Sequence, residues 1–112
     1  MKRIETRHPL GNADAFPEGL AVLREVNGRD ICVLRDGDTL RACSAWCPHQ
    51  YARMDGSPGE PGHIVCRYHG LRFNMVSGDC TNASGYSVEI IPLQTDSQTG
   101  EVFALTFDIV DD

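Results

Sequence analysis

The sequence predicts an all-β fold, an antiparallel sandwich or barrel that carries a small metal-binding insertion. Short segments rich in apolar and β-branched residues recur along the chain, and turn-forming residues separate them. Little of the chain has the apolar periodicity of a helix. Cysteine and histidine residues gather in its middle part, where we place the insertion. We expect a single domain over residues 1–112, because this length has room for one hydrophobic core.

A hairpin is predicted in the first half of the chain. Residues 20–26 and 30–34 are rich in apolar and branched residues, which favours strands. Asn27 and Gly28 between them form a strong hairpin signal, because both residues adopt the left-handed conformation that a tight turn needs. A second turn then leads to a third strand over residues 39–45, which ends at the metal-binding segment.

Four further strands are predicted in the second half. A short strand over 63–66 enters the second ligand loop, and the alternation of apolar and polar residues over 71–75 predicts a strand that leaves it. Residues 87–94 and 101–107 form the last two strands, joined by a hairpin at 95–100.

Two short pairs of metal-binding residues determine the chemistry. Cys47 and His49 enclose Pro48, and sixteen residues later Cys66 and His69 enclose two residues. The common zinc finger places both cysteines in one pair and both histidines in the other, because one ion collects all four. The alternating order suits two irons, since one iron can take both thiolates while the other takes both imidazoles. The residues between the pairs, 55–62, are dense in turn formers and predict an exposed connection.

This pattern resembles the Rieske family, in which Cys-x-His is followed by Cys-x-x-His and a [2Fe-2S] cluster is held by two cysteines and two histidines. Trp46 and Pro48 in the first loop, and Gly70 after the second, also look like the family. The resemblance implies a Rieske fold with a cluster-binding subdomain over about residues 43–86. It also implies that a Rieske-type [2Fe-2S] cluster is the cofactor and metal site, and that its ligands are Cys47, His49, Cys66 and His69.

Within the family, the chain is similar to the ferredoxin components of bacterial ring-hydroxylating aromatic dioxygenase systems. High-potential Rieske proteins place a disulfide where this chain has Ala52 and Tyr68, and hydroxyl donors where it has Leu71 and Phe73. The resemblance therefore implies a low potential, near about −150 mV. It implies a one-electron carrier and not an enzyme, which passes electrons from a flavin-dependent reductase to a terminal Rieske non-haem iron oxygenase through the exposed histidines.

Composition limits the partners and the compartment that we expect for the chain. The net charge of −6 disfavours nucleic acid as a partner, although Arg53, Arg67 and Arg72 beside the ligand loops give this region the opposite sign. No apolar run is long enough for a membrane span, and residues 1–11 do not look like a secretory signal. Cys32, Cys43 and Cys80 are an odd remainder that predicts no disulfide framework. We expect a cytoplasmic monomer without a membrane partner.

Two alternatives stay open at this point. The chain could be the small Rieske-type subunit of an assimilatory nitrite reductase, or, in a different class, a structural zinc-binding domain with the same four ligands. An oxygenase domain with its own mononuclear iron is disfavoured, because only His8 and His63 remain outside the ligand pairs. One departure from the family is the loop over residues 81–86, which lacks the prolines that cover the cluster in many relatives. Tyr86 is the candidate for that cover.

Overall fold

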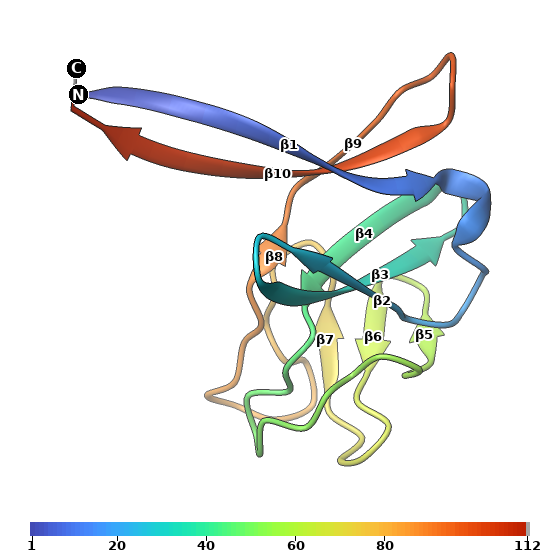
Figure 1. Cartoon of the computed structure of the whole chain (residues 1–112). Coiled ribbons are helices and arrows are strands. Elements are labelled where there is room, and N and C mark those ends of the chain that lie inside the picture. Colours follow the sequence, from blue (N-terminus) through green and yellow to red (C-terminus); the bar gives the residue numbers. More distant parts are fainter. Residues whose placement is uncertain (112) are drawn as a thin grey trace.

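The computed structural model describes residues 1–111, which form three antiparallel sheets (Figure 1). The first has the order β1-β10-β9 and consists of β1 (Lys2–Asn12), β10 (Glu101–Val110) and β9 (Leu93–Thr95). The second has the order β2-β3-β4-β8 and consists of β2 (Val22–Val26), β3 (Arg29–Asp36), β4 (Thr39–Ser44) and β8 (Ile90–Ile91). The third has the order β5-β6-β7 and consists of β5 (Gly59–Glu60), β6 (His63–Val65) and β7 (Arg72–Asn74).

The prediction of an antiparallel all-β fold is confirmed. Besides strands, residues 1–111 contain only one short 3₁₀ turn, η1 (Ala13–Ala15). Its first turn is capped by Asn12, whose side-chain oxygen accepts a hydrogen bond from the backbone N–H of Asp14. Within this described part, no helix is long and apolar enough to cross a membrane.

The first hairpin forms as predicted. Asn27 and Gly28 have φ values of 53° and 81°, so both lie in the left-handed region that a two-residue hairpin turn requires. The turn joins β2 to β3, with Val26 opposite Arg29 and Val22 opposite Val33. β4 continues the sheet on the other side of β3 and delivers the chain to the first ligand loop.

The prediction of one continuous strand over residues 87–94 is wrong. Pro92 divides it into β8, which pairs with β4, and β9, which pairs with β10. Proline has no N–H to donate to a ladder, so a strand is readily broken there. The chain thus moves from the second sheet to the first, and the predicted hairpin over 95–100 then joins β9 to β10.

Two strands lie where the sequence predicted none. β1 pairs with β10 along its whole length, from Lys2 opposite Val110 to Asn12 opposite Glu101. The outer part of this ribbon, which holds the start of β1 and the end of β10, projects from the rest of the molecule (Figure 1). Charged residues follow each other there without strict alternation, because neither face is fully buried. The two-residue β5 lies within the predicted exposed connection, where Gly59 pairs with Ile64.

The core consists of two buried clusters on opposite faces of β3. Ile31 and Val33 point into the cluster shared with the first sheet, whereas Cys32 and Leu34 point into the cluster shared with the third sheet. All four are buried, so burial of each large apolar side chain contributes about 1.5–3 kcal/mol. The second of these clusters also contains Cys47 and Cys66. The candidate metal site is therefore anchored directly in the core.

Candidate metal centre

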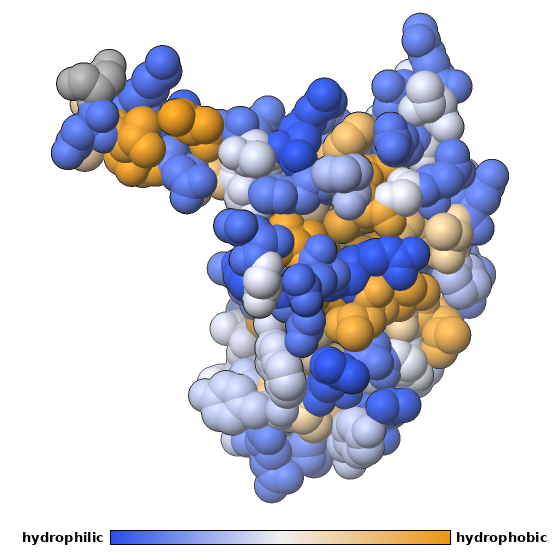
Figure 2. Space-filling model, in the orientation of Figure 1, coloured by the Kyte–Doolittle hydropathy of each residue, from blue (hydrophilic) through white to orange (hydrophobic). Residues whose placement is uncertain are grey.

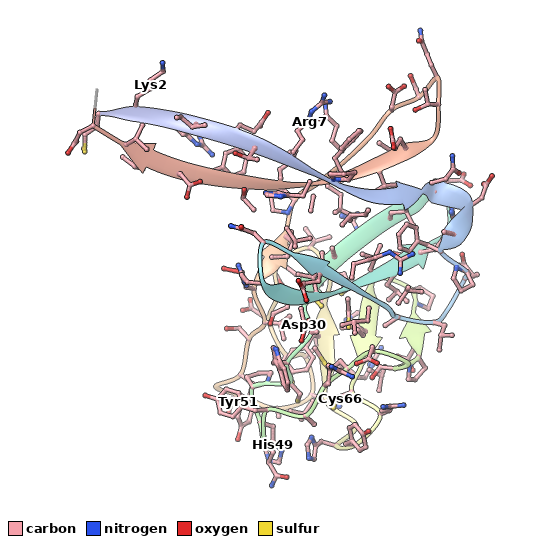
Figure 3. The ribbon with its side chains drawn as sticks, in the orientation of Figure 1. Lys2, Arg7, Asp30, His49, Tyr51 and Cys66 are labelled. Atoms are coloured by element: carbon pink, nitrogen blue, oxygen red, sulfur yellow. The ribbon has the colours of Figure 1, made fainter. Side chains whose placement is uncertain are left out.

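The first ligand loop is a tight turn closed by its own backbone. The N–H of Cys47 donates to the carbonyl of Ala52 at 2.8 Å, and the N–H of Tyr51 donates to the carbonyl of Cys47 at 2.7 Å. Tyr51 has a φ of 54°, a left-handed conformation that a bulky residue rarely adopts. The turn buries Cys47 and leaves His49 exposed at the end of the molecule (Figure 3).

The second ligand loop has the same geometry. The N–H of Cys66 donates to the carbonyl of Leu71 at 2.9 Å, and the N–H of Gly70 donates to the carbonyl of Cys66 at 2.8 Å. Gly70 takes the place of Tyr51 and has a φ of 71°. A Cβ atom at Gly70 would meet no atom within 4 Å, so glycine serves the left-handed φ here and not a close approach.

Three of the four predicted ligands lie together. The Nδ1 atom of His69 is 3.9 Å from the sulfur of Cys47 and 3.6 Å from the sulfur of Cys66, and all the donor atoms lie within 4.8 Å of one another. Burial raises the pKa of the Cys47 thiol, because the thiolate loses its hydration. A bound cation would offset that loss and favour the thiolate.

His49, the fourth predicted ligand, lies beside the imidazole of His69. Its ring centroid is 4.7 Å from that of His69 in an edge-to-face arrangement, although His49 is not part of the three-donor group. Tyr86 packs against the other side, with a centroid distance of 5.4 Å to His49. Tyr86 therefore contacts a predicted ligand, as the sequence led us to consider for the loop over 81–86.

The sequence did not reveal the residues that brace the loops. The Nε2–H of His69 donates to Oε1 of Gln50 at 3.1 Å, which leaves Nδ1 free to bind a metal. Asn82 accepts a hydrogen bond from the backbone N–H of Arg72 and donates one to the carbonyl of Gly70. These polar residues carry no spacing signal, because their partners are fixed only when the loops fold together.

Ser57 is a further brace that the sequence did not reveal. It is fully buried, and its hydroxyl accepts a hydrogen bond from the backbone N–H of Arg67 at 3.1 Å. The bond ties the connection between the two ligand pairs to the second loop. Cys32, Cys43 and Cys80 lie outside the three-donor group, and none of them forms a disulfide among the described residues.

The donor set suits a two-iron cluster. Both thiols lie together in the core and both imidazoles lie together at the exposed end, which matches a cluster with two thiolates on one iron and two imidazoles on the other. The three-donor group alone would also suit one tetrahedral ion. His49 beside His69 is the feature that distinguishes the two readings.

Comparison with known families decides between them. A family model for the Rieske [2Fe-2S] domain matches residues 6–92. The chain belongs to the Rieske [2Fe-2S] domain family. The Rieske fold and its [2Fe-2S] cofactor, which the resemblance implied, are thereby confirmed. No sequence among curated proteins matches this Rieske chain.

Solved structures share the fold. The ferredoxin of carbazole 1,9a-dioxygenase from Nocardioides aromaticivorans IC177 is 25% identical with a TM-score of 0.76, covering 87% of this chain and 96% of its own. A protein named as an NADH-dependent nitrite reductase small subunit from Mycobacterium tuberculosis is 18% identical with a TM-score of 0.86, covering 95% and 99%. Dicamba monooxygenase is 18% identical with a TM-score of 0.77, but the match covers only 32% of that enzyme and 88% of this Rieske chain.

Proposed function

We propose that this Rieske chain is a one-electron carrier in which Cys47 and Cys66 bind one iron and His49 and His69 bind the other. The observation that carries the proposal is the arrangement of the donors, thiols inside and imidazoles outside, in a member of the Rieske family. A bound Rieske cluster supplies one reversible electron. The buried cysteines fix that group in the core, and the two histidines at the exposed end are the shortest way out for the electron.

The carrier role is favoured over catalysis by what surrounds the centre. Four protein ligands fill every protein position on both irons, so no position is left for a substrate. A mononuclear iron site would need two more histidines and a carboxylate. His8 instead bonds Thr106 on the ribbon at 2.8 Å, and His63 bonds the carbonyl of Pro61 at 3.0 Å. The two histidines therefore do not form the pair of ligands that such a site needs.

We place the carrier between a flavin-dependent reductase and a terminal Rieske non-haem iron oxygenase of an aromatic catabolic system. The similarity to the carbazole 1,9a-dioxygenase ferredoxin supports this partner class, and another solved structure is a complex of reduced oxygenase and oxidised ferredoxin from a carbazole 1,9a-dioxygenase. Leu71 and Phe73 lack hydroxyl donors, which supports a potential near about −150 mV. A single cytoplasmic domain acting as a monomer is part of the same proposal.

A nitrite reductase small subunit is the second candidate. The solved structure with that name matches 95% of this chain with a TM-score of 0.86, against 87% and 0.76 for the first ferredoxin. The two functions differ in the protein that accepts the electron. In the oxygenase system, the reduced chain delivers the electron to a separate oxygenase.

The test is single-turnover oxidation of the reduced chain. We expect rapid loss of the reduced-state spectrum on mixing with a resting ring-hydroxylating oxygenase, and no comparable change with the large subunit of a nitrite reductase. The reverse selectivity would favour the second candidate. Reduction of neither protein, with the cluster intact, would contradict both.

A further inference from the structure

The exposed end around the two histidines, here called the tip, has a charge opposite to that of the rest of the chain. The two ligand segments, residues 47–53 and 66–72, contain Arg53, Arg67 and Arg72 and no acidic residue. The rest of the chain contains the other seven basic residues and all sixteen acidic residues. The two ligand segments are thus basic, whereas the rest of the sequence is strongly acidic.

Two of these three arginines are neutralised by neighbours. Arg53 pairs with Asp55 at 2.7 Å, and Arg72 pairs with Glu60 at 2.7 Å. Arg67 makes no ion pair with any of residues 1–111. It is therefore the arginine of the tip whose charge no carboxylate compensates.

Arg67 is also held in a fixed direction. Its guanidinium carbon lies 4.8 Å from the centroid of the Tyr68 ring, and one of its N–H groups donates to the Tyr68 hydroxyl at 2.8 Å. Tyr68 is 59% exposed and directly precedes His69. Because the ring already orders the arginine, little side-chain entropy remains to be lost on binding a carboxylate.

The surface around Arg67 has the character of a docking site. An open hollow of about 360 Å³ lies between Tyr68 and His69 on one side and Gln50, Ala52 and Arg53 on the other. Tyr68, on the wall of this hollow, is the aromatic ring on which the Arg67 guanidinium lies. An exposed tyrosine paired with an arginine is a combination that protein interfaces favour.

We propose that the tip docks on an acidic surface of its electron partner, with Arg67 pairing with a carboxylate and Tyr68 packing against the partner beside it. This inference rests on the proposed electron-carrier function and adds the chemistry of the docking face. The acidic remainder of the molecule is repelled by the same partner surface. Repulsion of the body and attraction of the tip together turn the histidines toward the acceptor.

The test compares two arginine variants of equal net charge. Arg67→Gln and Arg3→Gln both change the net charge from −6 to −7, and Arg3 likewise lies over an aromatic ring, that of Phe107 at 4.2 Å, but on the ribbon. The reduced protein is mixed in a stopped-flow instrument with ferricyanide, an anionic oxidant, or with hexaammineruthenium(III), a cationic one. At low salt, we expect Arg67→Gln to slow oxidation by ferricyanide about fivefold and to accelerate oxidation by the cation. Arg3→Gln should change neither rate by as much as twofold, and Arg67→Lys should keep most of the ferricyanide rate.

A protein probe and an inert anion complete the test. Oxidation by plastocyanin, an acidic copper protein, should become slower as salt is added and slower again in Arg67→Gln. Hexacyanochromate(III), a paramagnetic anion that accepts no electron here, should broaden the ring signals of Tyr68 in the wild-type protein and not in Arg67→Gln.

Equal effects of the two glutamine variants, or an oxidation by plastocyanin that becomes faster with salt, would overturn the inference. Loss of the cluster itself would contradict the proposed function instead, whereas the broadening by hexacyanochromate(III) would still report on Arg67.

Discussion

Burial separates the cysteines of this chain into different chemical classes. Cys32 and Cys43 lie opposite each other on β3 and β4, and both are fully buried. Burial raises the pKa of Cys32 to about 12, so at pH 8 only about one molecule in ten thousand carries the reactive thiolate. Burial also raises the pKa of Cys43, whereas Cys80 is partly exposed.

We therefore expect a maleimide at pH 8 to label the cluster-loaded protein at Cys80 alone, as measured by intact mass and peptide mapping. Labelling should extend to Cys32 only as the pH approaches the pKa of its thiol. The variant Cys80→Ser serves as the control and should remain unlabelled until it is unfolded. Labelling of Cys32 or Cys43 as fast as Cys80 would contradict the burial of these thiols.

Phe73 allows a test of the low potential. It is fully buried in the same core cluster as Cys47 and Cys66, and Phe73→Tyr adds a hydroxyl with almost no change in shape. A hydrogen bond to a charged group is worth about 1.5–3 kcal/mol, of which a difference of about 1 kcal/mol between the redox states would remain. Since about 59 mV corresponds to about 1.4 kcal/mol for one electron, the potential should rise by roughly 40 mV.

Protein-film voltammetry measures this shift. Phe16→Tyr is the matched control, because Phe16 is equally buried but belongs to the other core cluster, so its potential should stay at the wild-type value. An unchanged or lower potential in Phe73→Tyr, with an intact cluster, would refute the placement of that ring near the sulfurs.

At the scale of elements, turn chemistry was predictable and long-range pairing was not. Asn27 and Gly28 fix their hairpin locally, and the four candidate ligands were predicted from the type, order and spacing of their residues. β1 was missed because its partner β10 lies at the other end of the chain, and its exposed residues show no strict alternation. The division at Pro92 was missed because apolar residues continue on both sides of it. Gln50, Ser57 and Asn82 brace the site through contacts that exist only after folding.

Gly78, in the turn that follows β7, is the glycine whose backbone is most closely approached by another part of the chain. A Cβ atom there would lie 2.2 Å from the carbonyl oxygen of Val88, and its φ is 85°. Gly85 has a similar φ of 88°, but a Cβ atom would meet nothing within 4 Å. Gly85→Ala should therefore lower the free energy of unfolding by only about 1–2 kcal/mol, because alanine is strained in the left-handed conformation.

Gly78→Ala should cost clearly more, roughly 3–5 kcal/mol, because the backbone near Val88 must also move. Urea denaturation of both variants, followed by circular dichroism, gives the comparison. If the two alanine variants are equally stable, the close approach between Gly78 and Val88 does not exist in the folded protein.

At the scale of the whole molecule, the ribbon and the metal centre lie at opposite ends (Figures 1 and 3). Apolar side chains are exposed on the outer ribbon (Figure 2), where Phe107 and Ile109 lie on one face and Ile4 and Val110 on the other. The family match ends at residue 92 and so excludes β10.

We expect Phe107→Ser to leave the visible spectrum and the potential unchanged, although it removes the ring under Arg3 and lowers the melting temperature slightly. A potential that shifts with this substitution would mean that the ribbon and the metal centre are coupled.

His49 is the residue on which a two-iron centre depends, because a single ion could be held by Cys47, Cys66 and His69 without it. The decisive measurement is the metal and sulfide content of the wild-type protein and of His49→Ala, with His63→Ala as the control. We predict about two irons and two acid-labile sulfides per chain in the wild type and in His63→Ala, with the red-brown colour of a Rieske centre. In His49→Ala the colour and the sulfide should be lost. One zinc ion per wild-type chain, or a coloured and fully loaded His49→Ala, would contradict the assignment of the four ligands.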